Sequence, residues 1–185
     1  MAVSPLAMGG LTYGLSTVEM AAAFSAFANS GVYNSPKMYT EIRDSNGETV
    51  LKNEGETHVA MKETTAYFMN QMLTSVVNAG TGTSAKFSGM TIAGKTGTTS
   101  SNTDIWFCGV TPEYSAAVWV GYEHNYRLDG LYGRNAAEIW LKVMEKVHAG
   151  DSGLVFDSHP QDFVEETYCM DTGLLASGAC REAGR

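Results

Sequence analysis

Charged side chains are scarce in this 185-residue sequence, and basic ones are the scarcer kind. Lysine and arginine total 12 against 20 aspartates and glutamates, so the formal net charge at pH 7 is −8, and the basic residues form no block. The sequence therefore lacks the positive surface that attracts nucleic acids and anionic membranes. Long apolar runs are also missing, because even residues 116–120, one of the longest, fall far short of the roughly 18 residues of a membrane span. Residues 1–10 do not show the pattern of a secretory signal.

Residues that commonly bind metals are few, with 3 cysteines and 4 histidines. No Cys-x-x-Cys pair occurs and the histidines are scattered, so the pattern predicts no metal site and no cofactor. Cys108 lies in a strand-like run and is typical of a small buried apolar residue. Cys169 and Cys180 lie in a polar stretch near the end of the chain.

Proline is rare, with 4 residues, whereas 20 glycines supply sites for tight turns. Apolar residues make up 44% and charged residues 17%, a balance that excludes disorder and fits one globular domain. Asn46-Gly47 between two strand-like runs predicts a β-hairpin. Periodicity and capping signals predict helices at 17–29, 62–78 and 135–148, and strands near 91–99, 105–110 and 116–122.

The helix at 17–29 is apolar on every face, so we expect it to be buried all round. The helix at 135–148 is expected to be capped by Asn135. The links between the three strands are too short for crossover connections, so these strands should be sequential antiparallel neighbours. The predicted fold class is α+β, with helices packed on an antiparallel sheet. The predicted apolar face of the last helix consists of Ile139, Val143, Met144 and Val147.

One motif permits a nucleotide-binding interpretation. Residues 89–96 match the phosphate-loop pattern G-x-x-x-x-G-K-[ST], which would place Lys95 and the loop amides around phosphates. That loop needs a strand before its first glycine and a helix after its lysine, because the helix N-terminus holds the anion. Residues 83–88 make a poor strand and residues 97–103 are unsuited to opening a helix. A nucleotide-binding domain is therefore the weaker alternative.

The same stretch contains Lys95-Thr96-Gly97-Thr98, and a Lys-Thr-Gly on a strand is one signature of serine β-lactamases and penicillin-binding proteins. Lys95 would supply a fixed cation, and Gly97 would leave room for a substrate backbone. The Thr98 amide would be able to donate to a developing oxyanion. The Thr96 and Thr98 hydroxyls, two residues apart on a strand, would lie on one side and reach one carboxylate.

The residues around this motif carry a resemblance that covers residues 3–180. Residues 94–112 resemble the third-motif region of class A penicillin-binding proteins, and residues 116–122 resemble the strand that follows it. Residues 15–31 are similar to the helix between the second and third motifs of the family, and residues 80–85 to the loop before the strand of the third motif. Residues 169–180 are similar to an extension after the domain in some members. The resemblance implies a serine D,D-transpeptidase that cross-links peptidoglycan and is acylated by β-lactams.

The resemblance also implies roles for single residues. Lys95 and Thr98 are the expected catalytic residues, with Lys95 in the hydrogen-bond network around the serine and the Thr98 amide in the oxyanion hole. Thr96, Gly97 and Thr98 are the expected substrate-binding residues. The implied partners are peptidoglycan stem peptides and β-lactams. A D,D-carboxypeptidase or a serine β-lactamase is a close alternative, and a non-catalytic module that binds wall peptide or a protein is an alternative of another class.

The sequence departs from the family pattern in one respect, because no lysine stands at Ser-x-x-Lys spacing. Ser100-Ser101-Asn102 spells the second family motif, but it follows Lys-Thr-Gly at once and is typical of a turn. We therefore expect the C-terminal part of a transpeptidase domain, inactive alone, with the serine on the missing N-terminal part. A partly uncovered helix at 17–29 would favour homo-oligomers of the chain.

The remaining expectations concern location and the end of the chain. The resemblance implies a place on the extracytoplasmic face of the bacterial cell membrane, where disulfides persist. A Cys169–Cys180 disulfide and a reduced Cys108 are therefore expected. Residues 1–149 are expected to form the domain body, 150–160 a linker and 161–185 a C-terminal tail.

Overall fold

The centre of the molecule is a three-stranded antiparallel sheet. The computed structural model describes residues 9–11, 13–156, 164, 166–170, 172–176 and 178. The sheet contains β5 (Ala93–Thr98), β6 (Asp104–Val110) and β7 (Ser115–Gly121) in sequential order. Lys95 lies opposite Cys108, which lies opposite Ala117 in β7. The predicted antiparallel order and the α+β class are confirmed, and β5 leads to another strand rather than to the helix that a phosphate loop requires.

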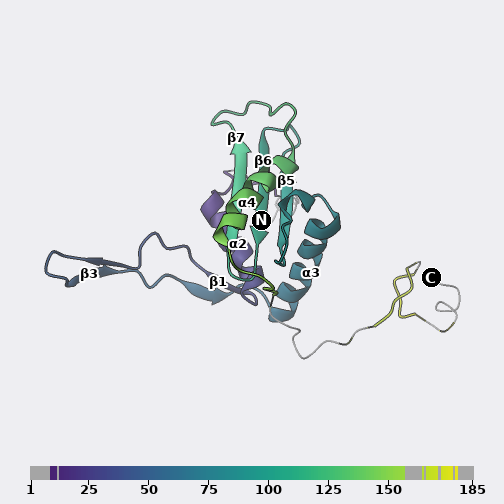
Figure 1. Cartoon of the computed structure of the whole chain (residues 1–185), viewed down its shortest axis with the longest axis horizontal. Helices are drawn as coiled ribbons and strands as arrows, with labels where there is room; N and C mark the ends of the chain where they lie inside the picture. The colour runs from purple at the N-terminus through teal and green to yellow at the C-terminus, as the bar shows by residue number, and fades with distance from the viewer. Residues whose placement is uncertain are drawn as a thin grey trace.

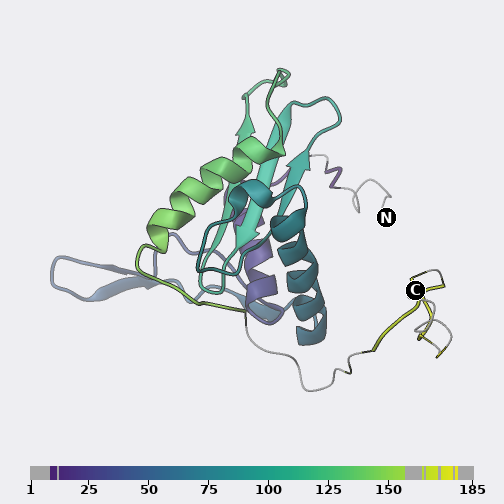
Figure 2. The ribbon, with the colours of Figure 1, turned by 45° about the vertical axis from the view of Figure 1, so that its right-hand side comes forward.

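Helices cover both faces of this sheet. The helix α4 (Gly133–Val147) crosses one face, α2 (Thr17–Ala28) packs on the other, and α3 (Glu63–Ala79) lies alongside β5 (Figures 1 and 2). Side chains of β6 alternate between the faces. Phe107 meets Trp140 of α4 with ring centroids 5.4 Å apart, whereas Val110 belongs to the cluster of Leu73 in α3.

The helix α2 begins at its predicted position but is less buried than predicted. Ser16 Oγ accepts a hydrogen bond from Glu19 N, and Ser16 N donates to Glu19 Oε2 at 2.8 Å, which confirms the capping box. Only Ala22 and Ala26 are buried, and Val18 is 48% exposed. The prediction of burial all round is wrong because only one face of the helix meets the sheet.

The helix α4 begins two residues earlier than predicted, at Gly133. Asn135 is not the cap but the third residue of the helix. Its side-chain Oδ1 reaches back and accepts a hydrogen bond of 2.8 Å from Tyr132 N. The predicted apolar face is wrong apart from Met144, since the buried face is made of Ala136, Ala137, Trp140 and Met144. Ile139, Val143 and Val147 are each about half exposed.

Two small strand pairs lie outside the main sheet. The hairpin of β2 (Glu41–Arg43) and β3 (Thr49–Lys52) projects far from the body (Figure 1) and turns at the predicted Asn46-Gly47, where Gly47 has a φ of 84°. The pair of β1 (Val32–Asn34) and β4 (Thr57–Val59) was not predicted, nor was the short 3-10 helix η1 (Thr83–Ala85). None of the described helices is long and apolar enough to cross a membrane.

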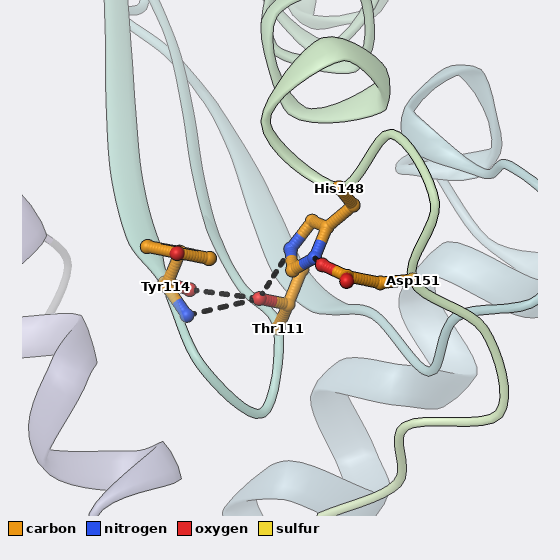
Figure 3. A network of polar contacts seen from close by, with 4 residues as sticks. All are labelled: Thr111, Tyr114, His148 and Asp151. Carbon is orange, nitrogen blue, oxygen red and sulfur yellow. Dashed lines mark hydrogen bonds and ion pairs between the residues drawn. The ribbon is translucent and has the colours of Figure 1, made fainter.

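A partly buried polar network ties the C-terminal end of α4 to the β6–β7 turn (Figure 3). His148 Nε2 lies 3.0 Å from Thr111 Oγ1, and His148 Nδ1 lies 3.1 Å from Asp151 Oδ2. Thr111 Oγ1 in turn accepts a hydrogen bond from Tyr114 N at 3.0 Å. Thr111 and His148 are both buried, so these bonds fix the helix end relative to the sheet.

The chain beyond α4 first runs back along the body. Gly153 N donates to Gly89 O at 2.7 Å, within the range expected to be a linker. Farther on, Tyr168 and Leu175 form an antiparallel bridge, and Cys169 is buried. Cys180 lies outside the described residues, so the expected Cys169–Cys180 disulfide stays a prediction, as do the domain boundaries. Cys108 carries a free, buried thiol.

Candidate active site

The predicted site residues lie on β5, at the edge of the sheet. In the part of the chain that the structure describes, β5 pairs with β6 alone. Lys95 and Gly97 share a face of the strand with buried Ala93, whose cluster includes Leu73 and Phe24. Thr96 and Thr98 point to the opposite face, which α4 covers.

The register shows which backbone groups face the open edge. Thr99 N donates to Asp104 O at 3.1 Å, one step beyond the Thr98–Ile105 pair of the ladder. Residues of an antiparallel pair alternate between those bonded to the partner strand and those whose N–H and C=O point away. Thr96 and Thr98 therefore direct their backbone groups away from β6. Consistent with this, Lys95 Nζ reaches the edge and donates to Thr96 O at 2.9 Å.

A cavity of about 320 Å³ adjoins this edge, a size within the range of small-ligand sites. Thr96 and Thr98 form one wall of it. Thr96 Oγ1 shares a hydrogen bond of 2.7 Å with Thr81 Oγ1, and Thr98 Oγ1 has no hydrogen bond to another described residue. The lining consists of Thr81, Thr96, Thr98, Tyr132, Gly133 and Arg134.

Gly133 lets the N-terminal end of α4 approach β5 closely, so that both elements line the cavity. A Cβ added at Gly133 would lie 2.8 Å from Thr96 Cβ, a distance that real Cβ atoms do not adopt. The loop before α4 is held to the β5–β6 turn, where Leu128 N donates to Asn102 O at 2.8 Å. Asn102 has a φ of 55° and lies in a turn, as the sequence predicted for residues 100–102.

Arg134 is the only charged residue among the six described residues that line the cavity. Its guanidinium carbon lies 5.6 Å from the centre of the Tyr132 ring. Sequence analysis missed Thr81 and Arg134, which come from a loop and a helix end and meet β5 only in the folded chain. The available signal was the glycine directly before Arg134, because a glycine at a helix start permits close backbone approach.

A second cluster lies at the other end of the sheet and shares His148 and Asp151 with the network of Figure 3. Ligand atoms of Glu113, His148 and Asp151 lie within 4.8 Å of one another. Both ring nitrogens of His148 already have protein partners, Thr111 and Asp151. We therefore regard this cluster as a structural tie, separate from the site on β5.

Comparison with known proteins identifies the class. The model of the penicillin binding protein transpeptidase domain family matches residues 2–145, and the chain belongs to this family. Penicillin-binding protein 1A of Clostridium acetobutylicum is 41% identical over 144 residues, which are 77% of this chain and 18% of that protein. Penicillin-binding protein 1A of Clostridium botulinum (strain Langeland) is 37% identical over 147 residues, 79% of this chain and 18% of that protein. The chain thus spans about a fifth of the length of the curated relatives it matches.

A solved structure agrees with this assignment. The D,D-transpeptidase domain of a peptidoglycan glycosyltransferase from Eggerthella lenta is similar with a TM-score of 0.57 and 32% identity. That alignment covers 70% of this chain and 32% of the other. The recognised family and the fold predicted from the sequence are therefore confirmed.

Proposed function

We propose that this chain supplies the Lys-Thr-Gly part of a serine D,D-transpeptidase that cross-links peptidoglycan. One observation carries the proposal: the outward-facing Thr98 amide and the Thr96 and Thr98 side chains meet at one cavity on the open edge of β5. An acyl-transfer site needs donors at the developing oxyanion and a holder for the rest of the substrate. The edge of β5 offers both within four residues.

In the proposed reaction, a serine Oγ attacks the carbonyl carbon of the penultimate D-alanine of a stem peptide. The C–N bond to the terminal D-alanine breaks, and that amine leaves with a proton. An amine of a second stem peptide then attacks the acyl-enzyme ester, the C–O bond to the serine breaks as the cross-link forms, and the amine gives up one of its own protons to the serine Oγ. β-Lactams would acylate the same serine, as the family resemblance implies.

The residues of β5 have distinct roles in this scheme. The Thr98 amide donates to the oxyanion, and the Thr96 and Thr98 hydroxyls bind the substrate carboxylate. Lys95 supplies positive charge beside the serine. Gly97 has no side chain and leaves room for the substrate on its face of β5, where, among the described residues, a Cβ added at Gly97 would meet only Trp106 Cβ, at 3.3 Å. The proposed chemistry takes place on the extracytoplasmic face of the bacterial membrane.

The nucleophile itself is proposed to lie outside these 185 residues, because none of the lysines follows a serine at Ser-x-x-Lys spacing. The experiment compares this chain with the complete product of the gene that encodes it, using a fluorescent penicillin. The chain should remain unlabelled, and the complete product should be labelled covalently. Covalent labelling of the 185-residue chain would show that it holds an unrecognised nucleophile.

A substitution in the complete product tests the role of the motif. Lys95→Ala should slow acylation at least about 100-fold, the scale for losing one electrostatic stabiliser. Lys86→Ala is the matched control, because Lys86 is exposed and does not line the cavity. Equal acylation rates in the two variants would contradict the proposal.

A further inference from the structure

We infer that Arg134 is the charge partner of the free carboxylate of the acyl donor, and so selects peptides that end in an α-carboxylate. The identity of the donor rests on the proposed function, whereas the anion site rests on the cavity between β5 and α4. The threonine hydroxyls of β5 are neutral, so they position a carboxylate without balancing its charge. Arg134, in the lining of the same cavity, supplies the missing charge.

The charge distribution supports an anionic ligand. The chain carries a net charge of −8, yet the six described residues that line the cavity include one arginine and no acid. Arg134 forms no ion pair with any carboxylate of the described residues, in contrast to Arg43 and Arg127, which pair with Glu41 and Asp129. A positive side chain without an internal counter-charge, in a cavity lined by hydroxyls, favours an anion from outside.

Two contacts place Arg134 beside β5. Gly133 brings the first turn of α4 against Thr96, and Arg134, the next residue, lines the same cavity. The Tyr132 ring lies under the guanidinium at 5.6 Å and leaves its planar N–H groups available. A guanidinium can form two parallel hydrogen bonds with a carboxylate.

The neutral groups of the cavity complete the site. The Thr98 hydroxyl has no partner among the described residues and is free to donate. The first turn of α4 holds no acidic residue, so the positive end of the helix dipole is not neutralised there. A carboxylate between Arg134 and Thr98 would therefore meet donors on both sides.

The experiment measures binding to the 185-residue chain, so it does not depend on acylation. The probes are N-acetyl-D-alanyl-D-alanine and its C-terminal carboxamide, titrated against backbone and arginine side-chain NMR signals. The carboxylate probe should shift the Thr98 and Gly133 amides and the Arg134 Nε–H signal, and the carboxamide should not. Arg134→Gln should weaken binding of the carboxylate about tenfold, the scale of one charge-assisted hydrogen bond.

Two further variants separate charge at this position from charge in general. Arg134→Lys should restore part of the affinity, because it keeps the charge but loses the planar fork. Arg127→Gln removes one positive charge from an exposed ion pair outside the cavity and should leave the affinity within about twofold. Equal binding of both probes, unchanged affinity in Arg134→Gln, or no shift of the cavity signals would overturn the inference. Carboxylate binding in a protein whose complete product is never acylated would instead refute the proposed function alone.

Discussion

Replacing Gly133 by alanine should destabilise the protein, although alanine is the better helix former. The added Cβ would lie 2.8 Å from Thr96 Cβ and 3.1 Å from Thr96 Cγ2. Carbon atoms in contact normally lie about 3.5–4.0 Å apart, so α4 and β5 must separate by about 0.7 Å or more. Overpacking of this kind costs about 1–3 kcal/mol. It outweighs the gain from alanine over glycine in a helix, which is at most about 1 kcal/mol.

With the full helix gain subtracted, the net loss is up to about 2 kcal/mol, which should lower the melting temperature by up to about 8 °C in a domain of this size. Urea denaturation of the 185-residue chain, followed by circular dichroism, measures the free energy of unfolding directly. The matched control is the same change in a Thr96→Gly background, where the obstructing side chain is gone and Gly133→Ala should become neutral or stabilising. A stabilising effect in the wild-type background, or the same cost in both backgrounds, would refute the close approach of α4 to β5.

Other predictions test the core and the caps. Burial raises the pKa of the Cys108 thiol to about 12, so iodoacetamide should alkylate it slowly in native protein at pH 8 and rapidly in urea. Denatured, unreduced protein should then show one thiol, because Cys169 and Cys180 are predicted to be paired. Hydrogen bonds from the Ser16 backbone and hydroxyl lower the pKa of Glu19 below 4.5. The ionised Glu19 carboxylate therefore stabilises the folded protein above about pH 4.5, and this contribution is lost as the pH falls. Glu19→Gln should flatten the dependence of the urea midpoint on acid pH. Thr111→Val should cost about 1–3 kcal/mol by leaving the buried His148 nitrogen unpaired, and Thr111→Ser should cost less.

The sheet could be predicted from the sequence because its information is local. The link between β6 and β7 contains Thr111-Pro112, and the link between β5 and β6 is a Ser-Ser-Asn turn. Neither link is long enough for a crossover, so only an antiparallel arrangement is possible. The capping box of α2 is equally local, since its two members lie three residues apart.

The face of α4 could not be predicted by counting aliphatic residues. Trp140 is fully buried and donates its Nε1 hydrogen to Ala116 O at 3.1 Å. One large ring fills the space over β6, and the small Ala136 and Ala137 allow the helix to come close. The more hydrophobic Ile139 and Val143 then point outward, because a helix can turn only one stripe toward a sheet. Packing therefore overrides hydrophobicity in deciding which stripe is buried.

The candidate site could be predicted only in part, for the same physical reason. The residues of the motif are contiguous, so their places on β5 follow from strand geometry. Arg134 lies 38 positions after Thr96, and its place beside the strand depends on the turn that Asn102 fastens and on the closeness that Gly133 permits. These are tertiary contacts between segments with no regular pattern, and neither periodicity nor capping reports them.

The register of β5 connects the core to the site. Gly94 and Gly109 lie opposite each other, and a Cβ at Gly94 would lie 2.6 Å from the Phe107 ring, while one at Gly109 would lie 2.8 Å from the Trp140 ring. A slip of one residue would place Ala93 or Lys95 against these rings, which leave no room for either. The same slip would turn the hydroxyls and outward amides of β5 to the wrong side. The aromatic packing under α4 therefore fixes which groups of β5 face the cavity, although none of those rings lines it.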